Sequence, residues 1–210
     1  MKRDIYFNSS YANFDRMKKI VFPIFIFTIL AIACKTKKKE KPASERFFPV
    51  LSFIKSQIAL VDSSLYSIRK IVYIDSTQTD TIYCTREQFR DLSSDFLAIP
   101  DLAASEYEDR FKEEKQFDEM LNRVIITYFP LEPDKEEIQK EEVLIQPDVS
   151  GDKVKSIIID HFINNRDSSV QKRMLWQVDH SFQVTTTRQL PGQPETSSIF
   201  KVIWNEDDNE

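Results

Sequence analysis

Hydrophobic residues recur every three or four positions just after residue 46, which is the spacing of one face of an α-helix. Pro49 falls within the first turn of this segment, where a proline is tolerated. The pattern therefore predicts a helix over residues 47–61. Its apolar positions are Phe47, Val50, Leu51, Ile54, Ile58 and Val61.

Two segments with strand-like alternation follow this predicted helix. Residues 65–75 alternate between two sets of side chains, as the two faces of a strand require. Residues 76–80 are polar and suit a turn, and residues 81–84 return as a second short strand. The sequence therefore predicts a β-hairpin over residues 65–84.

Helical signals return at residue 85. Thr85 and Gln88 have the spacing of a capping box, and apolar residues follow at helical spacing until Pro100. Ser105 and Glu108 repeat the capping signature, and Tyr107 precedes Phe111 by four positions. These patterns predict two short helices, the second near residues 105–115.

From residue 122 onward the pattern is that of strands joined by short connections rich in Pro, Gly, Asn and Asp. The predicted strands are Arg123–Phe129, Glu141–Gln146, Lys153–Phe162, Ser169–Val178, Phe182–Gln189 and Ser197–Trp204. Short connections favour an antiparallel meander. We therefore predict one α+β domain over residues 47–204, in which the N-terminal helix packs on a curved, mostly antiparallel sheet of about six to eight strands with two short inserted helices.

An apolar segment precedes this domain, from Ile20 to Ala33, between Lys18-Lys19 and a second basic cluster. It has 14 residues, fewer than the roughly 20 that a spanning helix needs. A charged start, an apolar core and small residues near its end are typical of a secretory signal peptide.

The end of the segment, Ala31-Ile32-Ala33-Cys34, resembles the lipobox of bacterial lipoprotein signal peptides, with alanine where leucine is commonest. The resemblance covers residues 17–34 and implies that Cys34 is lipidated and becomes the mature N-terminus. It also implies a membrane-anchored protein of the bacterial envelope, with the outer membrane favoured. Two alternatives stay open: an uncleaved single-pass anchor, and a buried helix of a cytoplasmic protein.

Residues 1–16 are polar and fit poorly before a signal peptide, so we expect Met17 to be the true start. Charge divides the rest of the chain. Residues 1–46 carry 11 Lys and Arg against 4 Asp and Glu, whereas residues 47–210 carry 18 against 30. The acidic domain argues against a nucleic-acid partner. The basic residues 35–46 are interpreted as a tether beside the membrane, with headgroup contact as an alternative, and residues 205–210 as an acidic tail.

Motifs for common enzyme classes are missing from the sequence. Only two glycines are present, at positions 151 and 192, which removes glycine-rich phosphate loops. With Cys34 lipidated, Cys84 has no disulfide partner, and we interpret it as a small apolar residue of a strand, with a reactive thiol as the alternative. No cofactor or metal site is predicted.

The remaining candidates for chemistry are two histidines and several carboxylates. Asp160-His161 and Asp179-His180-Ser181 look triad-like in print, but neighbours on a strand point to opposite faces. His180 is expected in a tight turn. We expect Glu136-Glu137 and Glu141-Glu142 to be solvated, while a catalytic pair stays open. Aromatic residues that belong to the core, or alternatively to a ligand groove, are Tyr66, Tyr73, Tyr83, Tyr128, Trp176 and Trp204.

These patterns favour a non-enzymatic binding or assembly module held at the envelope membrane. The first alternative is a carrier or chaperone of apolar ligands, which needs a cavity beneath the helix at 47–61. The second is a carboxylate-dependent hydrolase, which needs a cleft joining two acidic side chains.

Overall fold

An open antiparallel sheet of nine strands is the main element of the computed structural model, which describes residues 47–74 and 77–205. The described residues belong to one compact unit. The strands are β1 (Ile68–Tyr73), β2 (Thr79–Cys84), β3 (Phe111–Asp118), β4 (Arg123–Pro130), β5 (Ile138–Gln146), β6 (Lys153–Asn164), β7 (Ser169–Gln177), β8 (Ser181–Gln189) and β9 (Thr196–Ile203). The helices are α2 (Val50–Ser63), α3 (Arg86–Leu92) and α4 (Ser94–Leu97), with a 3-10 turn η2 (Pro133–Lys135).

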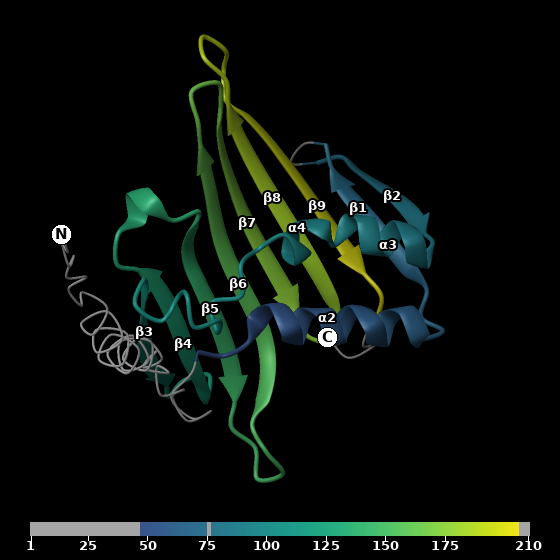
Figure 1. Ribbon diagram of the computed structural model, residues 1–210. Coiled ribbons are helices and arrows are strands. Elements are labelled where there is room, and N and C mark those ends of the chain that lie inside the picture. The colour runs from purple at the N-terminus through teal and green to yellow at the C-terminus, as the bar shows by residue number, and fades with distance from the viewer. Residues whose placement is uncertain (1–46, 75–76, 206–210) are drawn as a thin grey trace, which may run out of the picture. The chain divides into compact units, whose positions relative to one another are not determined.

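The strand order is β2-β1-β9-β8-β7-β6-β5-β4-β3, and every pair is antiparallel. Strands β3 to β9 form a meander. The sequence analysis predicted this arrangement for β4 to β9. The β1–β2 hairpin then joins the sheet beside β9. Because β2 and β3 each pair on one side only, the sheet is open and not a closed barrel (Figure 1).

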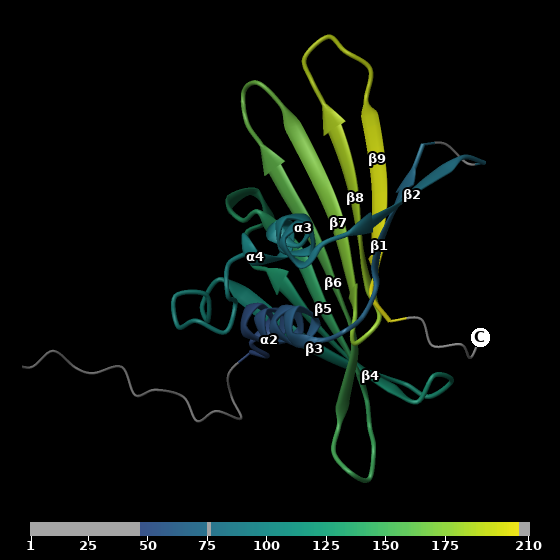
Figure 2. The ribbon, with the colours of Figure 1, turned by 90° about the vertical axis from the view of Figure 1, so that its right-hand side faces the viewer.

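Helices α2, α3 and α4 lie on one face of this sheet (Figures 1 and 2). The predicted helix at 47–61 is confirmed as α2, with Pro49 at its N-cap. The residues that α2 buries are Val50, Ile54, Gln57, Ile58 and Val61. They recur every three or four positions, so a single stripe of α2 faces the core.

An aromatic cluster fills the space between the helices and strands β7 to β9. Phe182 lies at its centre, and its ring contacts those of Trp176, Phe96 and Phe89. Trp204 closes the cluster beyond β9. All five side chains are buried, so this cluster supplies much of the apolar burial that stabilises the fold.

The predicted capping box is present at the start of α3. The backbone N–H of Gln88 donates to Oγ1 of Thr85 over 3.2 Å, and the backbone N–H of Thr85 donates to Oε1 of Gln88 over 2.8 Å. The helical pattern that follows is interrupted at Ser93, where α3 ends and α4 begins.

The helix predicted near residues 105–115 is wrong. Residues 101–110 form successive turns, and Phe111 begins strand β3. Tyr107 and Phe111 belong to one of these turns and not to a helix. The N–H of Phe111 donates to the carbonyl of Tyr107, and the two rings lie 6.1 Å apart. With β3 added, the sheet has nine strands and not six to eight.

Candidate functional site

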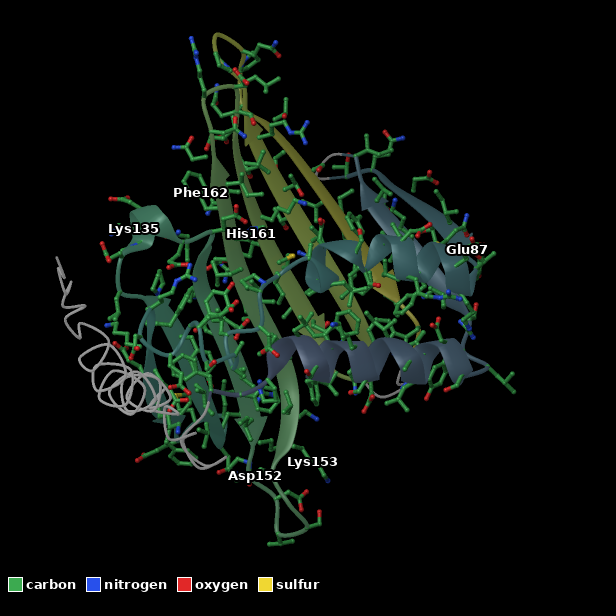
Figure 3. The ribbon with its side chains drawn as sticks, viewed as in Figure 1. Glu87, Lys135, Asp152, Lys153, His161 and Phe162 are labelled. Atoms are coloured by element: carbon green, nitrogen blue, oxygen red, sulfur yellow. The ribbon has the colours of Figure 1, made fainter. Side chains whose placement is uncertain are left out.

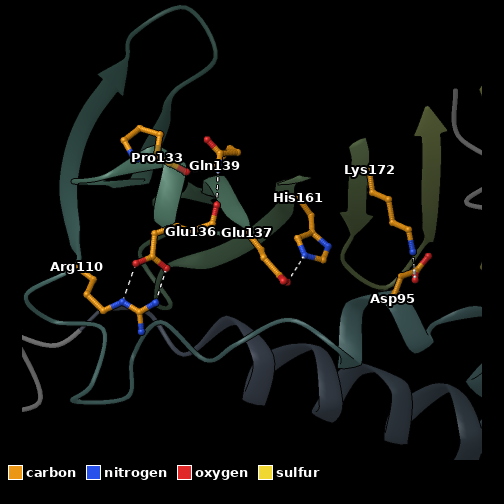
Figure 4. A network of polar contacts seen from close by, with 8 residues as sticks. All are labelled: Asp95, Arg110, Pro133, Glu136, Glu137, Gln139, His161 and Lys172. Carbon is orange, nitrogen blue, oxygen red and sulfur yellow. Dashed lines mark hydrogen bonds and ion pairs between the residues drawn. The ribbon is translucent and has the colours of Figure 1, made fainter. Parts of the chain in front are cut away.

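His161 lies on β6, where pairing with Lys172 of β7 places both side chains on the face that carries the helices. It is buried, and its Nε2 lies 3.1 Å from Oε2 of Glu137 (Figure 4). Glu137 precedes β5, in the connection that contains η2. The pair therefore ties this connection to the middle of the sheet.

Lys172 lies next to His161 across the strands and forms an ion pair with Asp95 of α4. Its Nζ is 2.5 Å from Oδ1 of Asp95, and both side chains are partly buried (Figure 4). This ion pair fixes the short helix α4 to the sheet at a distance of 77 residues along the chain.

The η2 connection makes a second set of polar contacts. Glu136 receives two hydrogen bonds from Arg110, at 2.7 and 2.6 Å, and Gln139 donates to the carbonyls of Pro133 and Glu136 (Figure 4). The bond to Glu136 raises the pKa of Arg110. The bidentate geometry is the strong form of such a pair.

A polar hollow of about 340 Å³ lies beside these contacts. Its lining includes Asp134, Glu136, Glu137 and Asn164, and also Lys135 and Phe162, which are labelled in Figure 3. Two of its three carboxylates are already engaged, Glu136 by Arg110 and Glu137 by His161. We therefore assign these pairs to holding the connection in place.

The two triad-like runs lie in different elements, Asp160-His161 on β6 and Asp179-His180-Ser181 at the turn before β8 and its first residue. His180 lies in the tight turn between β7 and β8. The backbone N–H of Asp179 in this turn donates to Oε1 of Gln57 on α2, and its carbonyl accepts from Asn205. Ser181 Oγ donates to Gln177 over 2.7 Å. The turn therefore joins α2 to the end of β9.

Glu141 corrects the expectation that the carboxylates at 141 and 142 are solvated. It lies on β5 between Tyr128 of β4 and Ile159 of β6, and it is 1% exposed. Neither of its carboxylate oxygens has a hydrogen-bond partner within the described part of the chain. Glu142 points to the other face and pairs with Lys140 at 2.7 Å.

The pKa of Glu141 follows from this environment. Burial raises it from 4.5 to about 8, and the charge of Asp101 adds to the rise. Desolvation disfavours the charged form of a carboxyl, so at neutral pH this group is mostly protonated and uncharged. Glu136, with a side chain 9% exposed, is the second carboxylate that was wrongly expected to be solvated.

Tyr128 lies beside Glu141 and is fully buried. Its hydroxyl accepts a hydrogen bond of 2.8 Å from the backbone N–H of Phe48, and its ring lies 4.7 Å from that of Phe47. Burial raises its pKa, and the nearby carboxylates of Glu113 and Glu141 raise it further. The raised pKa values of Glu141 and Tyr128 therefore favour the neutral forms of these two groups.

Exposed apolar side chains gather at the other end of the sheet, on the β1–β2 hairpin and the residues before it. Six of the thirteen large apolar side chains that are exposed in the described chain lie between residues 65 and 83. They are Leu65, Tyr66, Tyr73, Ile74, Ile82 and Tyr83. We call this set the hairpin surface.

A second hollow, of about 310 Å³, opens beside the hairpin surface. Its walls are Tyr66, Ser67, Arg69, Tyr83, Ile203, Trp204 and Asn205. The predicted aromatic set is thus divided: Tyr128 and Trp176 belong to the core, while Tyr66 and Tyr83 stand at this hollow together with the edge of Trp204.

Cys84 is unpaired and half-buried at the end of β2. Within residues 47–74 and 77–205, no group of three His, Cys, Asp or Glu side chains could hold a metal ion. None of the helices in the same ranges is both long and apolar enough to cross a membrane.

The predictions for residues 1–16, the start at Met17, the apolar segment 20–33, Cys34 and the tether at 35–46 concern residues outside the described ones, as does all of the tail at 205–210 except Asn205. No family model, no curated protein and no solved structure matches this chain.

Proposed function

We propose that this chain is a lipid-anchored protein of the bacterial cell envelope, and that its folded domain is a non-enzymatic binding or assembly module. The observation that carries the second half of the proposal is the hairpin surface. Exposed apolar side chains that cluster in one region mark a contact site, whereas scattered ones have no such meaning. Here six of them lie on a terminal hairpin and the residues before it, on both faces of the hairpin and beside a hollow.

The anchor rests on the sequence. A charged start, 14 apolar residues and Ala31-Ile32-Ala33-Cys34 together resemble a lipoprotein signal peptide. Lipidation at Cys34 would hold the domain at the membrane, facing the periplasm or the outer surface, through a basic tether. The tether suits anionic headgroups, while residues 47–210 carry a net charge of −12 from 18 basic and 30 acidic residues.

The polar groups of the described residues support a binding role over a hydrolytic one. Glu137 and His161 form a pair, as do Glu136 and Arg110, and both pairs join the η2 connection to the rest of the domain. The buried carboxyl of Glu141 lies away from the polar hollow, between Tyr128 and Ile159. A hydrolase would need two close carboxylates with access to substrate.

The carrier alternative needs space between α2 and the sheet. Ile54 of α2 and the side chains of Trp176 and Phe182 on the sheet are completely buried in one hydrophobic core, and the two aromatic rings are stacked. Packing of this kind favours a binding surface on the outside of the domain.

The anchor is tested by metabolic labelling with a fatty acid. We expect label in the wild-type chain and none in Cys34→Ala, because the thiol is the site of attachment. Cys84→Ala is the matched control and should label like the wild type. Equal labelling of the Cys34→Ala chain would overturn the anchor.

The binding role is tested by photo-crosslinking in cells. A photoreactive residue at Tyr83, which is 71% exposed, should give a discrete crosslinked species. The same residue at Met120, which is 96% exposed and lies in the β3–β4 turn, is the control. Identical patterns from both positions would count against the hairpin surface.

A further inference from the structure

Strand β2 ends the sheet, because among the described strands only β1 pairs with it. The direction of its backbone groups follows from one hydrogen bond in the hairpin. The N–H of Ile74 donates to the carbonyl of Gln78 over 3.0 Å. Opposed residues of an antiparallel pair alternate between hydrogen-bonded and non-hydrogen-bonded positions. The register therefore makes Val72–Asp80 and Lys70–Ile82 hydrogen-bonded pairs.

The intervening residues of β2 are Thr79, Thr81 and Tyr83, which oppose Tyr73, Ile71 and Arg69 at non-hydrogen-bonded positions. Their backbone N–H and C=O groups consequently point away from β1. Three donors and three acceptors thus line the outer side of β2, in the spacing that another extended strand would match.

The two ends of the sheet differ in how they discourage such pairing. Strand β3, at the far end, carries charge on both faces: Lys112 pairs with Glu114 at 2.6 Å, and Lys115 pairs with Glu113 at 2.7 Å. Charged side chains on an edge strand oppose addition of another strand. Strand β2 contains one charged residue, Asp80.

The side chains of β2 supply contacts for an added strand. Ile82 is 46% exposed and Tyr83 is 71% exposed. Tyr83 also forms a wall of the 310 Å³ hollow, together with Tyr66 and Trp204. A side chain opposite Tyr83 would therefore lie against an exposed aromatic ring, and one opposite Ile82 would cover an apolar residue.

The charge of Asp80 on β2 indicates which residues a partner strand should carry. Asp80 is the one charged residue of β2, and the part of the chain to which it belongs, residues 47–210, carries a net charge of −12 from 18 basic and 30 acidic residues. An added strand with a basic residue opposite Asp80 would be attracted, while an acidic one would be repelled. The same net charge disfavours a second copy of this chain as the occupant.

We propose that β2 binds an extended peptide segment as a tenth strand, and that this segment carries a basic residue opposite Asp80 and apolar side chains opposite Ile82 and Tyr83. This inference rests on the proposed binding function and names its partner class. The backbone of Thr79, Thr81 and Tyr83 supplies the hydrogen bonds, and the side chains of Ile82 and Tyr83 supply apolar contacts.

The test uses the full-length protein in detergent and a fluorescent form of the peptide Ac-Thr-Leu-Val-Thr-Lys-Val-Thr-amide. Its lysine falls opposite Asp80 when the peptide runs antiparallel to β2. We expect saturable binding by fluorescence anisotropy. Replacing the lysine with glutamate should weaken binding at least about threefold, because an attraction becomes a repulsion. Methylating the peptide N–H groups that face β2 should abolish binding.

The critical variant is Thr81→Pro, with Thr81→Val as its matched control. Thr81 lies at a non-hydrogen-bonded position, so proline removes an outward N–H and leaves the ladder to β1 intact. We expect Thr81→Pro to weaken peptide binding at least about tenfold and Thr81→Val to leave it unchanged. Asp80→Lys should reverse the preference, so that the glutamate peptide binds more tightly.

Several results would overturn the proposal: equal binding by Thr81→Pro and wild type, equal binding of the lysine and glutamate peptides, or no saturation at millimolar peptide. A wild-type dimer that Thr81→Pro dissociates in sedimentation would assign β2 to a second copy instead. Crosslinking from Tyr83 without peptide binding would overturn strand addition alone, whereas loss of crosslinking would count against the binding function itself.

Discussion

The face of the sheet that carries the helices has two unlike regions. Over β7 to β9 it is filled by aromatic rings around Phe182, which contact one another and the rings of α3 and α4. Over β3 to β5 it holds Glu113, Tyr128 and Glu141 in one row across the strands, with Asp101 nearby. The first region stabilises the fold at every pH, whereas the second does so only while its carboxyl is protonated.

The largest effect expected in this comparison concerns Glu141. The free energy of unfolding should fall as pH rises from 4.5, because the unfolded chain then releases a proton that the folded chain keeps until about pH 8. Below pH 4.5 Glu141 is protonated in both the folded and the unfolded chain, so its full contribution to the free energy of unfolding is present. At about 1.4 kcal/mol per pH unit, the free energy of unfolding should fall by as much as about 5 kcal/mol between pH 4.5 and about pH 8.

Urea denaturation at several pH values checks this prediction. Glu141→Gln keeps the size and polarity of the side chain but does not titrate, so its stability curve should lack this decline and cross above the wild type at alkaline pH. The groups facing Glu141, which are Asp101, Glu113 and Tyr128, are unchanged in the variant. Parallel curves for the two proteins would refute the assignment.

Phe182→Ala probes the aromatic region and should lower the free energy of unfolding by about 4 kcal/mol, because it removes a ring that contacts several others in a closed core. The loss should be the same at pH 5 and pH 8. Phe117→Ala is the matched control, since that ring is 51% exposed on β3, and it should cost less than about 1 kcal/mol. A similar loss of unfolding free energy in Phe182→Ala and Phe117→Ala would contradict the assignment of Phe182 to a tightly packed core.

Tyr128→Phe tests the polar region without changing its volume. It removes the hydroxyl that accepts from the N–H of Phe48. The expected loss is about 1 kcal/mol, measured by thermal or urea denaturation. An unchanged stability would mean that water replaces the hydroxyl at this N–H.

The smallest effect is expected for the ion pair between Lys172 of β7 and Asp95 of α4. Both side chains are partly exposed, so a double-mutant cycle with Lys172→Met and Asp95→Asn should give a coupling energy of about 0.5 kcal/mol. The coupling should shrink in high salt. A coupling that salt does not change would point to packing instead of charge.

Much of the sheet could be predicted from the sequence. The last six strands and α2 follow from apolar periodicity, because each buries one face or one stripe. Strand β3 was missed because its central residues, Lys112 to Lys115, are charged on both faces and leave no alternation to recognise. Turn residues with helix-cap spacing before it then suggested a helix.

The buried carboxyl was missed for a different reason. Glu141 and Glu142 are neighbours in sequence, and a pair of acids suggests solvent. Alternation was present all the same, since Glu141 shares a face with Val143 while Lys140 and Glu142 share the other. The hollow beside Tyr83 forms only because β1 pairs with β9. These two strands are more than 120 residues apart in the chain, and local sequence patterns do not encode such a distant pairing.

That pairing also sets an order of events during folding. Neighbours in the sheet are neighbours in the chain everywhere except at β1 and β9. Strands β3 to β8 can therefore assemble one after another as they emerge, whereas the β1–β2 hairpin, made early, must wait for the last strand before it has a place to dock. A chain exported from its N-terminus would thus complete this end of the sheet only after its final residues had crossed.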